Sequence, residues 1–317
     1  MRFLLDTEQR AFADSLHAML TAARTPAVIR EWSRGDHASG RALWRRIAEA
    51  GVFGLAVPEE FGGLGPRPVE LAIAFVELGR HAVPGPLVET VAAAVLLGEG
   101  PPAKRFLPGL VAGESVATVA APAGYALDGH AATLHLAPAA GGLLLSPGPG
   151  PVRPSLDPAR RPTPLASGGE LLTPDPPRAH ALTWARLATA AQALGVGLAL
   201  LDRTVAYVGQ RTQFGVPVGS FQAVKHRLAD ATIALEFARP LLFGAALSLS
   251  PADVAAAKLK ACEAAYATAR TALQLHGAIG YTAEYDLSLW LTKARALRTA
   301  WGTPEECRDA ILQDTQP

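Results

Sequence analysis

The sequence predicts a mainly α-helical protein in which a short β segment separates two helical parts. Apolar residues recur at helical spacing in residues 1–113 and again in residues 180–317, which is the pattern of helices that bury one face. Between them, in residues 114–179, proline and glycine are dense, and these residues interrupt helices. We therefore expect an N-terminal α-helical domain, a middle β domain and a C-terminal α-helical bundle with these boundaries.

The N-terminal part is expected to form several helices. Asp6 and Gln9 have the spacing of a capping box, which predicts that a helix begins there. Helical spacing of apolar residues predicts three more helices, over residues 41–50, 68–80 and 86–97.

The middle part contains three short runs of apolar and β-branched residues that are typical of strands. They lie at residues 116–119, 132–136 and 142–145, and each is followed by residues that favour turns. The sequence thus predicts a small β segment, or a segment that is partly irregular.

The C-terminal part is expected to hold five helices. Pro240 should kink or end the second one, because proline lacks a backbone N–H. Ser250 directly before Pro251 is a strong signal for the start of the third. The five are expected over residues 184–208, from Phe221 onward, from Ser250 to about Leu275, over residues 284–300 and from Thr303 onward.

Composition excludes several classes of protein. The formal net charge is +1 and aromatic residues make up 6%, which argues against a nucleic-acid surface. The two cysteines, Cys262 and Cys307, are far apart and form no metal-binding pattern. The N-terminus does not resemble a secretory signal, and no long uncharged apolar run is present. We expect a cytoplasmic protein without a metal or a membrane span.

A glycine-rich loop follows the predicted helix over residues 41–50. It runs through Pro58-Glu-Glu-Phe-Gly-Gly-Leu-Gly65, and its glycines allow positive φ or close approach of a ligand. An ordinary connecting loop explains the same residues.

Residues 211–222 carry side chains suited to a nucleotide. The Arg211 guanidinium can bind a pyrophosphate in bidentate fashion, and Phe214 can pack against an adenine ring. The Gln222 amide can both donate and accept hydrogen bonds. An exposed arginine and a core phenylalanine would account for the first two residues equally well.

A turn with two glycines, Gln274-Leu-His-Gly277-Ala-Ile-Gly280, follows a predicted long helix. Gly277 suits the C-cap position of that helix. Together, and in this order and spacing, the three segments resemble the acyl-CoA dehydrogenase family. The resemblance covers the N-terminal and C-terminal parts of the chain.

The resemblance implies a fold, an activity and a cofactor. The fold would be an α-helical domain, a β domain and a C-terminal four-helix bundle. The family desaturates acyl-CoA thioesters: a glutamate removes the α-proton, FAD takes the β-hydrogen as hydride, and an electron acceptor flavoprotein reoxidises the flavin. The residues that the resemblance assigns to FAD are Arg211, Phe214, Gln222, Gln274, Gly277 and Thr303.

The chain departs from the family pattern at the catalytic base. The family places its glutamate directly before a Gly-Thr pair, and here Trp301 precedes Gly302 and Thr303. An indole cannot accept that proton. Some members place the glutamate on the first helix of the C-terminal domain instead, where this chain has Ala185. The middle part is also shorter than the family's β domain, and Ala278 replaces a second glycine near the flavin phosphate.

These departures suggest the short, base-lacking subunit of an α2β2 acyl-CoA dehydrogenase. A homologous subunit with the glutamate would complete the site, and the substrate would be a fatty acyl-CoA or a steroid side-chain thioester. Two other hypotheses stay open. One is a flavin-dependent monooxygenase on the same scaffold, which needs no such base. The other is a non-catalytic scaffold subunit.

Overall fold

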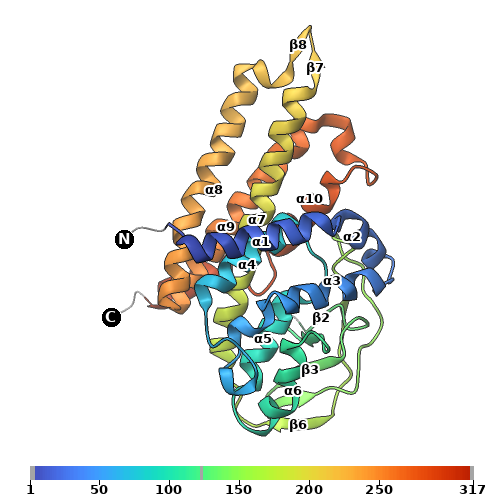
Figure 1. The fold of residues 1–317 in the computed structure, drawn as a ribbon, viewed down its shortest axis with the longest axis vertical. Coiled ribbons are helices and arrows are strands. Elements are labelled where there is room, and N and C mark those ends of the chain that lie inside the picture. The colour runs from blue at the N-terminus through green and yellow to red at the C-terminus, as the bar shows by residue number, and fades with distance from the viewer. Residues whose placement is uncertain (1–3, 122–123, 315–317) are drawn as a thin grey trace.

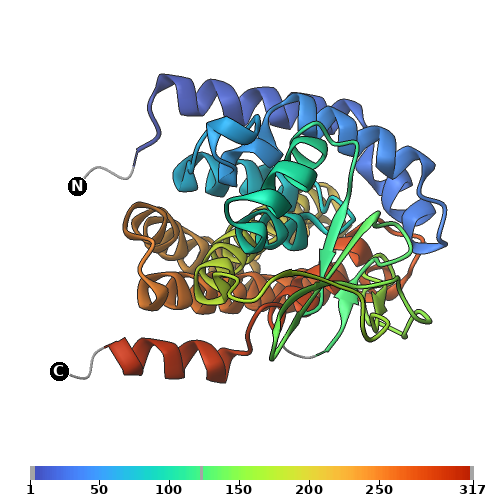
Figure 2. The same ribbon diagram turned by 90° about the horizontal axis from the view of Figure 1, so that it is seen from below.

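The computed structural model describes residues 4–121 and 124–314 and is mainly α-helical, as the sequence predicts. Its long central helix is α7 (Arg178–Gln210). Figure 2 shows the N-terminal helices on one side of α7 and the C-terminal helices on the other, with the small sheet beside them. One continuous apolar core joins these parts.

The N-terminal helices begin and end close to where the sequence predicts. The capping box is confirmed: the Gln9 N–H donates to Asp6 Oδ1 at 2.8 Å, and the Asp6 N–H donates to Gln9 Oε1 at 3.2 Å. Two helices, α2 and α6, were not predicted individually. The helices are α1 (Thr7–Ala22), α2 (Thr25–Ser33), α3 (Ala38–Glu49), α4 (Pro68–Arg80), α5 (Leu87–Leu97) and α6 (Pro101–Val111).

Helices α4 and α7 approach each other very closely. A Cβ atom added at Gly195 would lie 1.9 Å from the backbone oxygen of Val76. One added at Gly79 would lie 2.1 Å from the backbone oxygen of Gln192. The absence of side chains at these two glycines therefore lets the helix backbones touch.

The middle part forms a four-stranded sheet in the order β1-β3-β4-β6, in which β1 runs parallel to β3 and the other pairs are antiparallel. Helix α5 packs against β1. The three predicted strands exist: β4 has the predicted ends, β1 begins one residue later, and the ends of β3 are shifted by two and three residues. The strands are β1 (Ala117–Val119), β2 (Ala126–Leu127), β3 (Leu134–Ala139), β4 (Gly142–Leu145), β5 (Pro162–Thr163) and β6 (Glu170–Thr173).

The C-terminal part is a helical bundle in which α7 and α9 pack together along much of their length. Helices α8 and α10 complete it, and α11 packs on α9. A short hairpin of β7 (Thr212–Gln213) and β8 (Val216–Pro217) joins α7 to α8. The remaining helices are α8 (Gln222–Ser248), α9 (Pro251–His276), α10 (Leu287–Leu297) and α11 (Pro304–Asp314).

Several predicted helix boundaries in the C-terminal part differ from the structure. Helix α7 begins at Arg178, six residues earlier than predicted. Of the two outcomes expected at Pro240, a kink or an end, the end is wrong, because α8 continues to Ser248. Proline removes one N–H, and Ala238 and Leu242 on either side are buried, so packing outweighs the lost hydrogen bond. Helix α10 begins at Leu287, later than predicted, because Arg30 binds Asp286 at 2.6 Å and the carbonyl oxygen of Glu284 at 3.0 Å.

Helices α7 and α8 are long and apolar enough, by length and composition alone, to cross a membrane. The apolar stretch of α7 is 94% buried within the fold, as in the core helix of a bundle. That of α8 is 33% buried, because one side of α8 packs on α9 and the other is open. Such a pattern is weak support for a membrane span.

Candidate active site and contact arm

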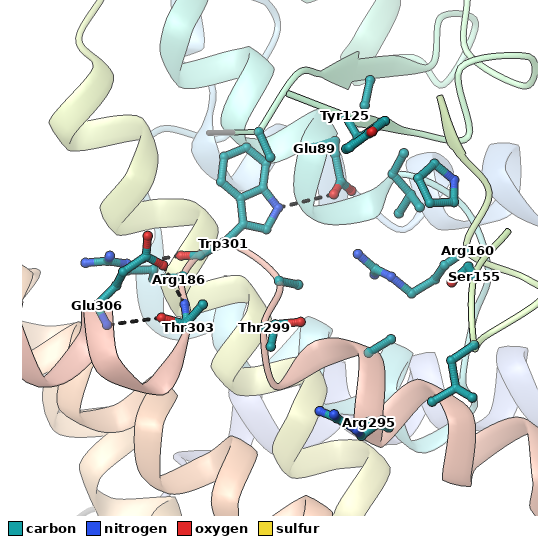
Figure 3. Close-up of a pocket in the computed structure, with 18 of the residues that line it drawn as sticks. Glu89, Tyr125, Ser155, Arg160, Arg186, Arg295, Thr299, Trp301, Thr303 and Glu306 are labelled. Carbon is teal, nitrogen blue, oxygen red and sulfur yellow. Dashed lines mark hydrogen bonds between the residues drawn. The ribbon is translucent and has the colours of Figure 1, made fainter. Parts of the chain in front are cut away.

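A cavity of about 740 Å³ lies where the three parts of the chain meet. Its lining comes from α5, from the segments around β2 and β5, from the start of α7, and from the turn between α10 and α11 (Figure 3). Its size matches that of a small-molecule site. The cavity is therefore the candidate active site of the chain.

Trp301 lies in the turn at the edge of this cavity, in the position before the Gly-Thr pair. Its φ is +57°, which is uncommon for a residue other than glycine. Two buried cations hold the turn: Arg186 Nε donates to the Trp301 carbonyl at 3.1 Å, and Lys258 Nζ donates to the Gly302 carbonyl at 2.6 Å. The fold thus keeps this backbone in place although no base stands there.

The Trp301 side chain points into the fold and meets a carboxylate. Its indole Nε1 donates to Glu89 Oε1 at 3.2 Å (Figure 3), and 8% of the residue is exposed. Ala185, the other position where the family keeps a glutamate, is fully buried in α7. Neither position offers a proton acceptor.

Glu89 is the carboxylate that the sequence analysis missed. It lies on α5, is 4% exposed, and faces the cavity between Trp301 and Arg160. Burial raises the pKa of Glu89 above its ordinary value, although Arg160 and the Trp301 N–H both favour the charged form. Desolvation is the largest of these effects, so the environment of Glu89 disfavours its charged form relative to a carboxyl group in water.

We expect Glu89→Gln to change the pH dependence of stability. Relative to the unmodified chain, the free energy of unfolding of the variant should rise as the pH rises. A carboxyl group with a raised folded-state pKa stabilises the fold fully below its ordinary pKa of 4.5, and this contribution is lost as the pH rises through the folded-state pKa. The amide keeps an acceptor for Trp301 and cannot ionise. Urea unfolding at several pH values measures the effect.

The exposed Glu99, just beyond the C-terminal end of α5, offers a matched control for loss of one negative charge. Glu99→Gln should not reproduce the change. A constant difference between Glu89→Gln and the unmodified chain from pH 4 to pH 8 would contradict the assignment.

The structure presents residues 211–222, which we call the contact arm, at the far end of the bundle. Figure 1 shows this arm at the tip of the molecule, where β7 and β8 project beyond α7 and α8. Arg211 and Gln222 are exposed at the ends of these two helices. The interpretation of Phe214 as a core residue is wrong, because it is 91% exposed.

The geometry of the hairpin turn explains why Phe214 projects. Phe214 has φ of +54° and Gly215 has φ of +78°, and positive φ at both central residues is typical of a type I′ turn. The phenylalanine therefore occupies a position that glycine or asparagine would fill with less strain. A large exposed aromatic side chain in such a turn suits contact with a ligand or a partner.

The turn with two glycines, Gln274 to Gly280, lies at the same end of the bundle as the contact arm. The Tyr207 ring stacks on His276 at 4.2 Å between centroids, and the Tyr207 carbonyl accepts the Arg211 N–H at 2.9 Å. Tyr207 thus connects the contact arm to the end of α9. Gln274 is exposed there, and Gly277 is the C-cap with φ of +64° and open space around it.

Thr303 is separated from the other five predicted flavin residues. It lines the cavity and forms a capping box with Glu306: the Thr303 N–H donates to Glu306 Oε2 at 2.6 Å, and the Glu306 N–H donates to Thr303 Oγ1 at 3.2 Å. The roughly 24 residues from Arg186 to Gln210 along α7 span about 36 Å at 1.5 Å per residue. The contact arm therefore cannot reach the cavity of its own chain.

The glycine-rich loop over residues 58–65 folds back on the preceding turn. The Leu64 N–H donates to the Gly54 carbonyl at 2.9 Å, and a Cβ atom at Gly63 would lie 1.9 Å from the Val57 oxygen. Packing within the loop thus accounts for Gly63. The cavity is lined by other described segments.

The charged residues around the Trp301 turn escaped the sequence analysis for one reason. Glu89 is the only charged residue in α5, whereas the helices of Arg186 and Lys258 also carry other charged residues. A lone charge in an apolar helix is the signal that could have identified Glu89, because burial of an unpaired charge is costly. Which part of the chain pairs with it depends on the fold.

The comparisons with known proteins agree with this architecture. The model of the acyl-CoA dehydrogenase N-terminal domain matches residues 6–114, and that of the C-terminal domain matches residues 179–315. The chain belongs to the acyl-CoA dehydrogenase family, a family of oxidoreductases.

Individual relatives match along nearly the whole chain. Acyl-CoA dehydrogenase IpdE2 of Mycobacterium tuberculosis is 33% identical over 304 residues, covering 94% of each protein. A solved structure of the Tcur3481-Tcur3483 steroid ACAD is 26% identical with a TM-score of 0.81, covering 96% of this chain and 97% of that one. The Mycobacterium tuberculosis ChsE4-ChsE5 complex is 24% identical with a TM-score of 0.86 over the full length of both chains, which shows the shared fold.

Proposed function

We propose that this chain is the base-lacking subunit of a heteromeric, FAD-dependent acyl-CoA dehydrogenase. It supplies flavin contacts to a site completed by a homologous, glutamate-bearing partner subunit. The reaction is α,β-desaturation of an acyl-CoA thioester, and the partner removes the α-proton. Electrons leave through an electron acceptor flavoprotein.

The observation that carries this proposal is the separation of two half-sites, which are the cavity at Trp301 and the contact arm of residues 211–222. Trp301, which lines the cavity, and Ala185, which is buried in α7, occupy the two positions of the base, whereas the exposed contact arm lies about 36 Å away along α7. An arm that projects from the bundle, with an unpartnered Arg211 guanidinium and an exposed Phe214 ring, is suited to contact another chain. The relative Tcur3481-Tcur3483, which pairs two named proteins, supports a heteromer.

The residues at this end of the bundle fit the pyrophosphate and adenine end of FAD. Arg211 makes no side-chain hydrogen bond or ion pair within the described residues, so its guanidinium is free for a phosphate. The exposed Phe214 offers a flat apolar face, and Gln222 and Gln274 offer amide donors. When bound, FAD accepts hydride, and the tasks of this chain are to bind and orient its nucleotide end.

The short β segment of this chain supports the proposal that the partner subunit binds the flavin ring. The main sheet of this chain has four short strands, and β1 and β3 lie against α5 and the core. We therefore assign flavin contact and oligomerisation to residues 180–317 and a structural role to the truncated segment 114–179. Likeness to a steroid ACAD favours a bulky steroid side-chain thioester as the substrate.

We expect the purified chain to contain far less than one FAD per chain, as measured from its flavin absorption spectrum. Co-expression with a glutamate-bearing relative should give a stable complex that contains FAD and reduces an electron acceptor when acyl-CoA is added. Flavin near one per chain in the isolated protein would contradict the shared-site model and would favour a self-sufficient flavoenzyme such as a monooxygenase. A stable complex whose flavin content and activity do not depend on Arg211 would favour the scaffold subunit.

A further inference from the structure

A group of three side chains that could hold a metal lies away from both half-sites, where α1 meets α4. His17 comes from the middle of α1, and Glu77 and His81 come from the C-terminal end of α4. One nitrogen or oxygen atom from each lies within 4.8 Å of the others. Neither the proposed flavin contacts nor the cavity uses these residues.

In this group, the single ring nitrogen His17 Nδ1 faces two possible hydrogen-bond acceptors, Glu77 Oε2 and His81 Nε2. His17 Nδ1 lies 3.0 Å from Glu77 Oε2 and 3.2 Å from His81 Nε2. A proton on Nδ1 can point directly at only one of these two atoms. If Nδ1 instead accepts from His81, its lone pair faces the carboxylate. A single cation between the three atoms would satisfy all of them at once.

The distances from His17 Nδ1 to Glu77 Oε2 and to His81 Nε2 are close to those between neighbouring ligand atoms around zinc. Ligand bonds of about 2.0–2.1 Å in a tetrahedral site separate neighbouring ligand atoms by roughly 3.3–3.4 Å. The two contacts of His17 Nδ1, at 3.0 and 3.2 Å, are up to a few tenths of an ångström shorter, so small rotations of the side chains would admit the ion. His17 is 52% exposed at its side chain, which leaves the outer side open to water as a fourth ligand.

The charges around the group permit a cation, although they lower its affinity. His81 contacts His17, and the guanidinium groups of Arg80 and Arg203 add positive charge near His81. Arg80 Nε lies 3.6 Å from Glu77 Oε1, and its Nη1 binds Asp202 at 2.9 Å. Asp202 offsets part of the positive charge of Arg80.

We propose that His17, Glu77 and His81 form a Zn²⁺ site with two imidazole ligands, one carboxylate ligand and one open position. Zinc suits this ligand set because it accepts nitrogen and oxygen ligands in tetrahedral geometry. The ion would tie α1 to α4, and α4 in turn packs on the central helix α7. The site would therefore fasten the N-terminal helix to the core of the fold.

Isothermal titration of the untagged chain with ZnCl₂ tests the site. We expect one saturable zinc per chain, and His17→Ala, His81→Ala and Glu77→Gln should each weaken binding by at least about tenfold, since even loss of a residue that only orients a ligand costs 10–100-fold. His17→Ala changes an exposed side chain, so its folding should be intact. His226→Ala, which removes an exposed histidine on α8, is the control and should bind zinc normally.

Hydrogen exchange gives a second readout that does not depend on enzyme activity. Zinc should slow exchange of the α1 amides in the unmodified chain and leave them unchanged in His17→Ala. Two outcomes would overturn the proposal: an unmodified chain that shows no saturable zinc binding, or zinc binding that is equally tight in His17→Ala and Glu77→Gln. Neither outcome would bear on the shared flavin site, because zinc is not part of it.

Discussion

Arg211→Ala in the assembled complex is expected to weaken FAD binding by roughly 10- to 150-fold, equivalent to about 1.5–3 kcal/mol for a lost hydrogen bond to a charged group. Arg211 is exposed at the end of α7 and has no other described side-chain partner to lose. The change should therefore leave the stability of the isolated chain almost unaltered. Fluorescence titration of the flavin-free complex with FAD measures the loss.

Arg34→Ala provides the matched control for this experiment. Arg34 is an exposed arginine at the C-cap of α2, away from the contact arm. It should leave the FAD dissociation constant unchanged. If Arg211→Ala and Arg34→Ala bind FAD equally tightly, Arg211 does not contact the pyrophosphate, and the hypothesis of a scaffold subunit gains support.

Gly195→Ala is expected to destabilise the fold by roughly 3 kcal/mol, at the upper end of the usual effect of overpacking a core. The added methyl group would lie 1.9 Å from the Val76 oxygen and 2.8 Å from the Arg80 nitrogen. Both are backbone atoms of α4, so neither can rotate away, and α4 and α7 would have to separate. Urea unfolding followed by circular dichroism measures the loss.

Gly209→Ala, in the last turn of the same helix, separates this effect from helix propensity. No atom lies within 4 Å of a Cβ at that position. Alanine should stabilise the helix there by up to about 1 kcal/mol. Equal stability of Gly195→Ala and Gly209→Ala would show that α4 and α7 tolerate a wider separation than the structure indicates.

The sequence predicted helix starts and helix limits correctly where the signal lies in neighbouring residues. The Asp6–Gln9 capping box and the Ser250–Pro251 helix start both appear in the structure. The limits of α4 and α5 were also predicted to within one residue. Helix caps and periodicity act over a few residues, so one segment contains the whole signal.

Pro240 shows where local rules fail. The rule that proline ends a helix is local, but α8 is stabilised by burial of Ala238 and Leu242 on either side of it. Phe214 shows the reverse: an aromatic residue would be expected in the core, yet the turn of the hairpin exposes it. Long-range packing and turn geometry decide such cases.

The family resemblance, the order of helical and β parts, and the absence of a glutamate at residues 185 and 301 could all be predicted without a structure, because they depend on residue identity and spacing. The folded structure was needed to show that Trp301 binds Glu89 from α5, that two buried cations hold its turn, and that the contact arm lies far from the cavity. The same is true of the His17–Glu77–His81 group. Most of those relations join residues that are 44 to more than 200 positions apart in the sequence, and only the packing of the helices brings them together.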